Sequence, residues 1–288
     1  MIAARNLNPN LKALVNGLMV GNVYYVGTNG DNMASGAEYK RRLKNLQYAT
    51  SKLVSANNDY VLCFGSETGA AAVEISAANA HIIGCSMGIG DTMGRGYAYT
   101  CPATVDTLQP TIAADYLEIA NIRFICHATD HILIDDAGCD DAYFHHNTVS
   151  GSTTASDAIR LDIEGARWTI NDNIFQLCKL AIDLAGASCV VNNNRIYDLD
   201  TAAKGLVIGA SAHYCIVRGN TFNLVGTTGD IAVTIAASAD HTELAYNNFS
   251  ALTSDAIADS GTATQMWHNF NTAVTGTSTS SIPLVIVT

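Results

Sequence analysis

A short phrase built on asparagine returns through the second half of the chain. It reads HHNTVSG at 145–151, NDNIFQL at 171–177, NNNRIYDL at 192–199, VRGNTFNL at 217–224 and AYNNFSAL at 245–252. The marker residues are Asn147, Asn173, Asn194, Asn220, Asn247 and, in the equivalent place, His268, so that the successive spacings are 26, 21, 26, 27 and 21 residues. A recurring period of this length predicts a solenoid in which each repeat is one turn.

Two further apolar runs recur in phase with the marker. One run lies ten to thirteen residues before each marker, at 131–134, 158–161, 181–184, 205–208, 232–235 and 255–258. Another run leads directly into the marker, and in both runs β-branched and other aliphatic residues alternate with polar ones, which is the period of a strand. Because one turn cannot bury its apolar face alone, the turns must stack and their strands form parallel sheets. The sequence therefore predicts an all-β fold, a single-stranded parallel β-helix over residues 60–272.

The asparagines themselves are predicted to be corner residues between sheets. Their side-chain amides can hydrogen-bond the backbone or one another in a ladder while the chain turns. The residue two places further on is predicted to point into the core: Val149, Phe175, Ile196, Phe222 and Phe249.

The chain before residue 60 has a different pattern. Residues 22–30, NVYYVGTNG, are typical of a strand that ends in a turn. Residues 38–54 place Tyr39, Leu43, Leu46, Thr50 and Leu53 or Val54 on one stripe, which predicts an amphipathic helix of about four turns. We expect this helix to cover the open end of the stack, since a solenoid needs a cap over its terminal apolar side chains. The expected organisation is an N-terminal docking arm (1–21), a capping strand and helix (22–59), the β-helix (60–272) and a C-terminal linker and strand (273–288).

The bulk composition limits the partners. The formal net charge is -11 and the pI is about 5.0, so we expect no nucleic acid and no anionic membrane as partner. Neither a run of 18 apolar residues nor the apolar stretch of a signal peptide occurs, which favours a soluble chain made without secretion. The eight cysteines are scattered without CxxC pairs, and we interpret them as reduced core thiols, with disulfides or a zinc site as the alternative.

One acidic patch is the best candidate for chemistry. We align Ile134, Leu161, Leu184 and Ile208 in one column of the predicted stack. Asp135 then lies beside Asp162, and Arg160 lies beside Asp183 one turn away. Carboxylates clustered on one sheet face could act as general acid and base or bind calcium. The competing interpretation is that Arg160 and Asp183 are an ordinary cross-strand charge pair and that the other aspartates are solvated surface positions.

Two other patterns are weaker as sites. His127 and His131 are four residues apart, and His145 and His146 follow one strand later, but this spacing aims imidazoles at one metal only on a helix. Residues 84–99 are glycine-rich without the lysine and helix of a phosphate-binding loop. We therefore expect no metal and no cofactor.

The order of elements resembles a known group of proteins. The strand VYYVGTNG, the amphipathic helix, the segment DYVLCFGSETG and the N-x-F/I/V turns resemble the right-handed β-helix proteins of the pectate-lyase-like superfamily over about residues 22–272. Within it the sequence is most similar in style to virion proteins of tailed bacteriophages that are described as head fibre, decoration or cement proteins. The resemblance implies a right-handed, non-enzymatic structural protein that decorates or cements a capsid in the virion, assembled in the host cytoplasm. It also implies a homotrimer and the major capsid protein or another virion protein as partner.

The alternative within the same resemblance is a tailspike or tail-fibre domain that binds or cleaves host surface polysaccharide. In that case Asp135, Asp162, Asp183 and Arg160 would line the glycan groove. A bacterial surface adhesin is a third interpretation, which the absent signal peptide disfavours.

The N-terminal arm is the candidate docking element. Its apolar residues recur at helical spacing outside the predicted solenoid: Leu7, Leu11, Leu14, Val15 and Leu18. An apolar stripe of this kind needs a covering surface, which is the chain's own turns, a sister subunit or a virion lattice. The apolar strand at 282–287 either folds back as a second cap or pairs with another chain.

Overall fold

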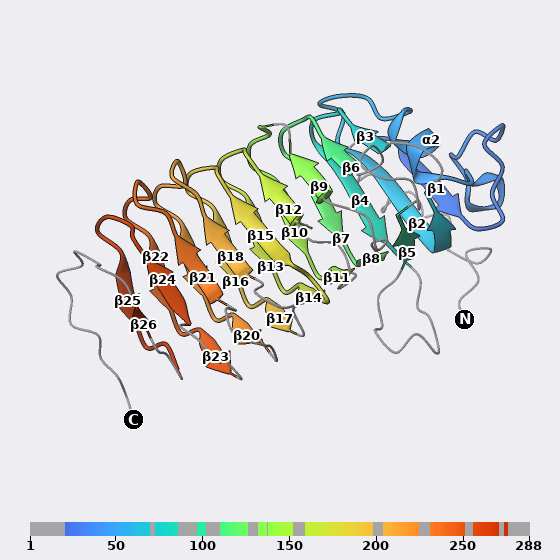
Figure 1. The fold of residues 1–288 in the computed structure, drawn as a ribbon. Coiled ribbons are helices and arrows are strands. Elements are labelled where there is room, and N and C mark those ends of the chain that lie inside the picture. The colour runs from blue at the N-terminus through green and yellow to red at the C-terminus, as the bar shows by residue number, and fades with distance from the viewer. Residues whose placement is uncertain are drawn as a thin grey trace.

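The chain winds into stacked turns, each made of up to three short strands (Figure 1). The structure, a computed structural model, describes residues 21–69, 73–85, 97–101, 110–125, 132–136, 138–151, 159–197, 204–224, 231–250, 256–270 and 274–275. Every strand pairing in these ranges is parallel. The predicted fold class is confirmed, since the chain is an all-β, right-handed parallel β-helix.

Three sheets run along the length of the molecule, and each turn adds one strand to each sheet. Sheet A contains β1 (Val23–Gly27), the first half of β2 (Asp59–Thr68), β4 (Ala80–Gly84), β7 (Glu118–Ala120), β10 (Tyr143–His145), β13 (Thr169–Asn171), β16 (Val190–Asn192), β19 (Ile216–Arg218), β22 (Glu243–Ala245) and β25 (Gln265–Trp267). Sheet B contains the second half of β2, β5 (Tyr97–Thr100), β8 (Ile122–Ile125), β11 (Thr148–Ser150), β14 (Ile174–Gln176), β17 (Arg195–Tyr197), β20 (Thr221–Asn223) and β23 (Asn248–Ser250).

Sheet C is formed by the apolar runs that precede the marker asparagines. It contains β3 (Val73–Ile75), β6 (Pro110–Ile112), β9 (Ile132–Asp136), β12 (Ile159–Ile163), β15 (Leu180–Leu184), β18 (Lys204–Ile208), β21 (Ile231–Ile235), β24 (Ile257–Asp259) and β26 (Val274–Thr275). Because β26 pairs with β24, sheet C continues past residue 272, where the sequence had placed the start of a linker. The apolar strand predicted at 282–287 lies outside the described residues.

A left-handed residue marks the tight corner between sheets A and B. It stands directly before each of the five marker asparagines, and also before Ile122 and Asn269. Its φ lies between 52° and 64° in seven successive turns: Asn121, His146, Asp172, Asn193, Gly219, Tyr246 and His268. This conformation reverses the chain within one residue, but it costs energy for any residue other than glycine. The asparagine that follows supplies the compensating hydrogen bonds.

The marker asparagines form a continuous buried ladder at this corner. All five predicted members, Asn147, Asn173, Asn194, Asn220 and Asn247, are 0% exposed. Each side-chain oxygen accepts a backbone N–H from the equivalent position one turn earlier, at 2.8–3.0 Å. The donor is Ile122 for Asn147 and a marker asparagine in the other turns. Each side-chain nitrogen donates to a backbone carbonyl of sheet A in that earlier turn at 2.8–2.9 Å. The ladder thus satisfies the buried backbone N–H groups at the corner and adds a hydrogen bond to one strand carbonyl in each turn.

The last member of the ladder differs from the prediction. The side-chain oxygen of Asn269, not His268, accepts the N–H of Asn247 at 2.9 Å. His268 takes the left-handed corner position instead, with a φ of 52°. The N-x-F pattern placed the marker one residue too early, because Phe270 follows Asn269 directly and is 50% exposed.

The core is a set of stacked side-chain columns. Val149, Phe175, Ile196, Phe222 and Phe249 lie in register on sheet B and are 0% exposed, as predicted. The rings of Phe222 and Phe249 stack at 5.2 Å between centroids. The described cysteines are all free thiols, and all are buried except the half-buried Cys85. They pack as small apolar residues in the core.

The predicted four-turn capping helix is wrong in extent. Residues 38–54 contain a 3₁₀ turn, Tyr39–Arg41, and one short α-helix, α2 (Leu46–Thr50), which packs against β1, β2 and β3. Between them Leu43 exchanges backbone hydrogen bonds with β1, which a helix cannot do at the same time. Leu43 and Leu46 are buried as expected, whereas Tyr39 and Val54 are exposed. No helix in the described part of the chain is long and apolar enough to cross a membrane.

Candidate functional site

The acidic patch is assembled by sheet C, with a register that differs from the prediction. The backbone of Asp162 pairs with Asp135 on one side and with Asp183 on the other. The predicted neighbours Arg160 and Asp183 are therefore not in register, because Leu184 pairs with Ile163 rather than with Leu161. Three aspartates occupy one column, and the column continues with Val207 and Thr234.

Arg160 and the aspartates face different surroundings. Arg160 is 0% exposed and its guanidinium packs beside Gly151, so it does not lie on the open face of the patch. Burial raises the pKa of Asp183, and the charge of Lys204, on the next strand, partly opposes this. Two neighbouring carboxylates of which one has a raised pKa are suited to proton transfer.

A second polar cluster on the outer face of sheet A was missed by sequence reasoning. Glu118 lies in register with His81 and one rung from His145 along the sheet. One carboxylate oxygen of Glu118 contacts His81 Nδ1 at 2.5 Å and the other contacts His145 Nε2 at 2.8 Å. The network extends through His81 to Asn58 and through His145 to His146. We call these residues the Glu118 network.

The Glu118 network is electrostatically unusual but does not converge on a metal. Hydrogen bonds from His145 and then from His81 lower the pKa of Glu118 to about 2, against the opposing effect of burial. The two imidazoles contact different oxygens of one carboxylate, so the three groups do not surround a common point. No group of three His, Cys, Asp or Glu residues in the described ranges is arranged to hold a metal ion.

The Glu118 network predicts that the wild type is more stable than Glu118→Gln at neutral pH and that this difference disappears in acid. The folded pKa of Glu118, about 2, lies below the ordinary glutamate value of 4.5. The stabilisation that its ionised form provides is therefore complete above 4.5 and is lost as the pH falls towards 2. Glu118→Gln is expected to lower the free energy of unfolding by about 2 kcal/mol at neutral pH, after allowance for partial solvent screening. Denaturant titrations at several pH values measure this. Glu74→Gln, at an exposed position on β3, is the control, and a Glu118→Gln loss that stays constant down to about pH 2 would contradict the account.

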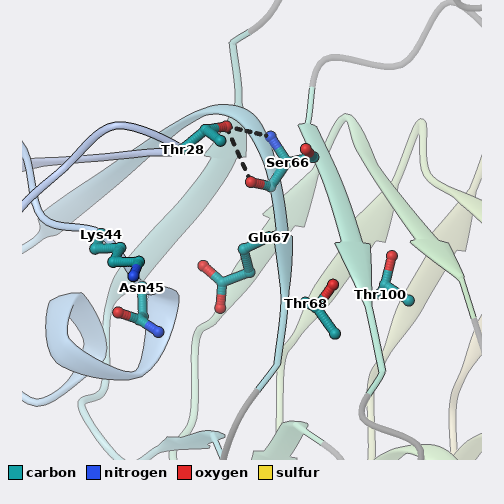
Figure 2. Close-up of a pocket in the computed structure, with 7 residues that line it drawn as sticks. All are labelled: Thr28, Lys44, Asn45, Ser66, Glu67, Thr68 and Thr100. Atoms are coloured by element: carbon teal, nitrogen blue, oxygen red, sulfur yellow. Dashed lines mark hydrogen bonds between the residues drawn. The ribbon is translucent and has the colours of Figure 1, made fainter.

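A polar hollow lies where the cap meets the first turn (Figure 2). It has a volume of about 320 Å³ and is lined by Thr28, Lys44, Asn45, Ser66, Glu67, Thr68 and Thr100. Thr28 closes the free edge of β2 beside it, because its hydroxyl accepts the Ser66 N–H and donates to the Ser66 carbonyl, both at 3.0 Å. In Figure 2 the Glu67 carboxylate points from β2 towards Asn45 at the start of α2. No sequence motif marked this hollow, since its lining comes from four separate segments.

Two stacked aromatic pairs flank the last strands of sheet A, one before the strands begin and one after they end. Tyr214 stacks on His241 and Tyr246 stacks on His268, both at 5.1 Å, and the two tyrosines are 59% and 54% exposed. The two tryptophans differ in role. Trp168 is buried and donates from its indole nitrogen to the Cys139 carbonyl at 2.8 Å, whereas Trp267 lies on β25 and is partly exposed.

Several predicted residues lie outside the described part of the chain. These are the docking residues Leu7, Leu11, Leu14, Val15 and Leu18, the histidines His127 and His131, and most of the glycine-rich segment 84–99. The side chain of Asp135 is also not described, and its place is known from the backbone register alone.

Comparison with known proteins does not assign the chain to a family. No family model matches the sequence, and no curated protein matches it. A solved structure of a rhamnogalacturonan lyase is similar with a TM-score of 0.27 and 11% identity, over 92% of this chain and 66% of that one. The chain thus spans slightly less than two thirds of the length of that lyase. At this similarity the likeness carries no argument about activity, and the fold rests on the strand pairing described above.

Proposed function

We propose that the chain is a structural virion protein, not an enzyme, that decorates or cements a bacteriophage capsid. The observation that carries the proposal is the buried asparagine ladder, which runs without a break from the Ile122 amide to Asn269. A rod whose corners are tied in every turn resists bending and local opening, as a component of an external lattice requires. The resemblance in element order supports the same class of protein.

The proposed partners follow from the charge of the chain and from the apolar pattern of its first residues. We propose a homotrimer bound to the major capsid protein or another virion protein, in the virion, after assembly in the host cytoplasm. The net charge of -11 supports a protein partner rather than nucleic acid or an anionic membrane. Leu7, Leu11, Leu14, Val15 and Leu18 are the proposed contact residues.

Binding to capsids that lack the protein tests the docking arm. The double variant Leu11→Asp, Leu14→Asp is expected to reduce cosedimentation with such capsids at least about tenfold, because charge in an apolar contact is costly to bury. Asn16→Asp, which adds a charge off the apolar stripe, is the matched control. Unchanged circular dichroism and an unchanged trimer mass by light scattering would show that the rod is intact. Equal cosedimentation of the double variant and the wild type would refute the arm as the docking element.

A polysaccharide-binding or polysaccharide-cleaving tailspike domain is the second candidate. The backbone of Asp162 lies directly between those of Asp135 and Asp183, which favours this second candidate. The exposed side chains of Tyr214 and Tyr246 favour it as well. Wild-type protein incubated with host surface polysaccharide is expected to release no oligosaccharide. Release that is lost in Asp162→Ala but kept in Glu74→Ala, which is also on sheet C, would replace the structural proposal with this one.

A further inference from the structure

The cap and the β-helix meet where sheet B begins without a strand beneath it. β1 pairs with β2 from Tyr60 to Phe64, and the remainder of β2, from Gly65 to Thr68, pairs with β5. No described strand lies on the other side of that remainder. The cap supplies the contacts of this part of β2 instead, through Thr28 to Ser66 and through the Leu46 N–H to Glu67. A side chain that points inward from the second half of β2 therefore faces the cap, because no neighbouring described strand of sheet B lies on that side.

Glu67 is that inward-pointing residue, and it bridges the two parts. It lies in register with Tyr99, whose side chain is in the core. One carboxylate oxygen of Glu67, Oε2, accepts the backbone N–H of Leu46 at 2.8 Å and the hydroxyl of Tyr97 at 2.5 Å. Leu46 is the first residue of α2, and Tyr97 belongs to the next turn of sheet B. One carboxylate thus ties the cap to two turns of the rod.

The polar hollow gives Glu67 access to protons. Oε1, the other carboxylate oxygen, has no hydrogen-bond partner among the described residues, and the carboxylate lies on the wall of the hollow of about 320 Å³ (Figure 2). A proton can therefore add to Oε1 while Oε2 keeps both of its donors. Proton binding need not break the link between cap and rod.

The groups around Glu67 determine whether protonation of its carboxylate stabilises or destabilises the junction. Burial raises the pKa of Glu67, and the hydrogen bonds from Tyr97 and from the Leu46 N–H lower it by less. The other titratable groups that face this junction are Lys44 on the rim of the hollow, Tyr99 on the strand above and Cys63 on β2. A carboxyl with a folded pKa above its unfolded value stabilises the folded form in acid. That advantage is lost as the pH rises from the unfolded value to the folded one.

We propose that Glu67 is a pH-sensitive latch that holds the cap on the β-helix more tightly when it is protonated than when it is ionised. In acid the junction buries a neutral carboxyl whose Oε2 still accepts both of its hydrogen bonds. At higher pH it buries a charge that the two donors compensate incompletely, and local opening of the cap becomes more frequent. The latch acts at the capped end of the rod, and it does not depend on the proposed virion role.

Native-state amide exchange of α2 tests the latch in the full-length chain. The exchange rates of Ala49 and Ser51, corrected for intrinsic chemistry, report the opening of the cap between about pH 4 and about pH 8. In the wild type the open population is expected to rise several-fold across this range. In Glu67→Gln it is expected to be independent of pH, while Glu74→Gln behaves like the wild type. A rise that persists in Glu67→Gln would overturn the proposal.

Tyr97→Phe tests the same latch without removing the carboxyl. It removes a hydrogen-bond donor that favours the ionised form, so the folded pKa of Glu67 is raised further. The rise in opening is then expected to continue to a higher pH, and to be larger in total, than in the wild type. If Glu67→Gln fails to fold, Tyr97→Phe still tests whether Glu67 controls the opening of the cap. A rise that levels off at the same or a lower pH than in the wild type would contradict the latch.

Discussion

Replacement of Asn220 by alanine is expected to lower the free energy of unfolding by about 4 kcal/mol. The Asn220 side-chain nitrogen donates to the Val191 carbonyl and to Asn247 Oδ1, and its oxygen accepts the backbone and side-chain N–H groups of Asn194. Alanine leaves the backbone N–H of Asn194 buried without its acceptor and also removes the hydrogen bonds to the Val191 carbonyl and to Asn247. A buried group without a partner costs about 1–3 kcal/mol. Equilibrium denaturant titration followed by circular dichroism measures the loss.

Two matched variants show whether the loss belongs to the ladder. Asn223→Ala changes the same residue type three positions further on, outside the ladder and partly exposed, and is expected to cost less than about 1 kcal/mol. Asn269→Ala removes the last member of the described ladder and is expected to fall between the two. Equal losses for Asn220→Ala and Asn223→Ala would show that the corner bonds do not hold the turns together.

Truncation of the buried Phe222 to alanine is expected to cost a similar amount, about 4 kcal/mol. Phe222 is 0% exposed and lies between Ile196 and Phe249 in one column of sheet B. The turns above and below are held by their own strands, so they cannot collapse into the cavity that alanine leaves. The same denaturant titration gives the magnitude.

Phe222→Leu is the control for this second prediction. Leucine keeps most of the volume and all of the apolar character, so its cost is expected to be less than half of that of alanine. A loss below about 1 kcal/mol for Phe222→Ala would contradict the stacked core. It would indicate that sheet B packs loosely and that the ladder alone maintains the fold.

The fold was predictable because each turn repeats one local signal. Asn220 and Phe222 are separated by one residue in the strand direction, so a corner residue and a core residue recur at fixed positions in every turn. The corner and the strands follow from this local pattern. The cap was less predictable, since Leu43 satisfies a helical period and yet forms backbone hydrogen bonds with β1.

The register of the acidic patch was not predictable from periodicity. A shift of two residues leaves every side chain on the same face of its sheet, so Leu184 fits beside Leu161 as well as beside Ile163 by pattern alone. The observed pairing moves Asp183 next to Asp162 and separates it from Arg160. Loop lengths between the strands vary, and only the assembled backbone fixes the choice.

The Glu118 network was missed for a related reason. Glu118 is 37 residues from His81 and 27 from His145, and no sequence motif joins them. The available signal was that all three occupy outward positions of strands in sheet A. That signal becomes visible only after each strand is assigned to its turn.

The measurement that tests the proposed function most directly is electron microscopy of purified virions, with the protein located and its copies counted. We predict many copies of a β-helical rod on the capsid, each trimer in contact with several capsid subunits. A protein that is absent from the head and present in a few copies at the tail would contradict the decoration or cement role.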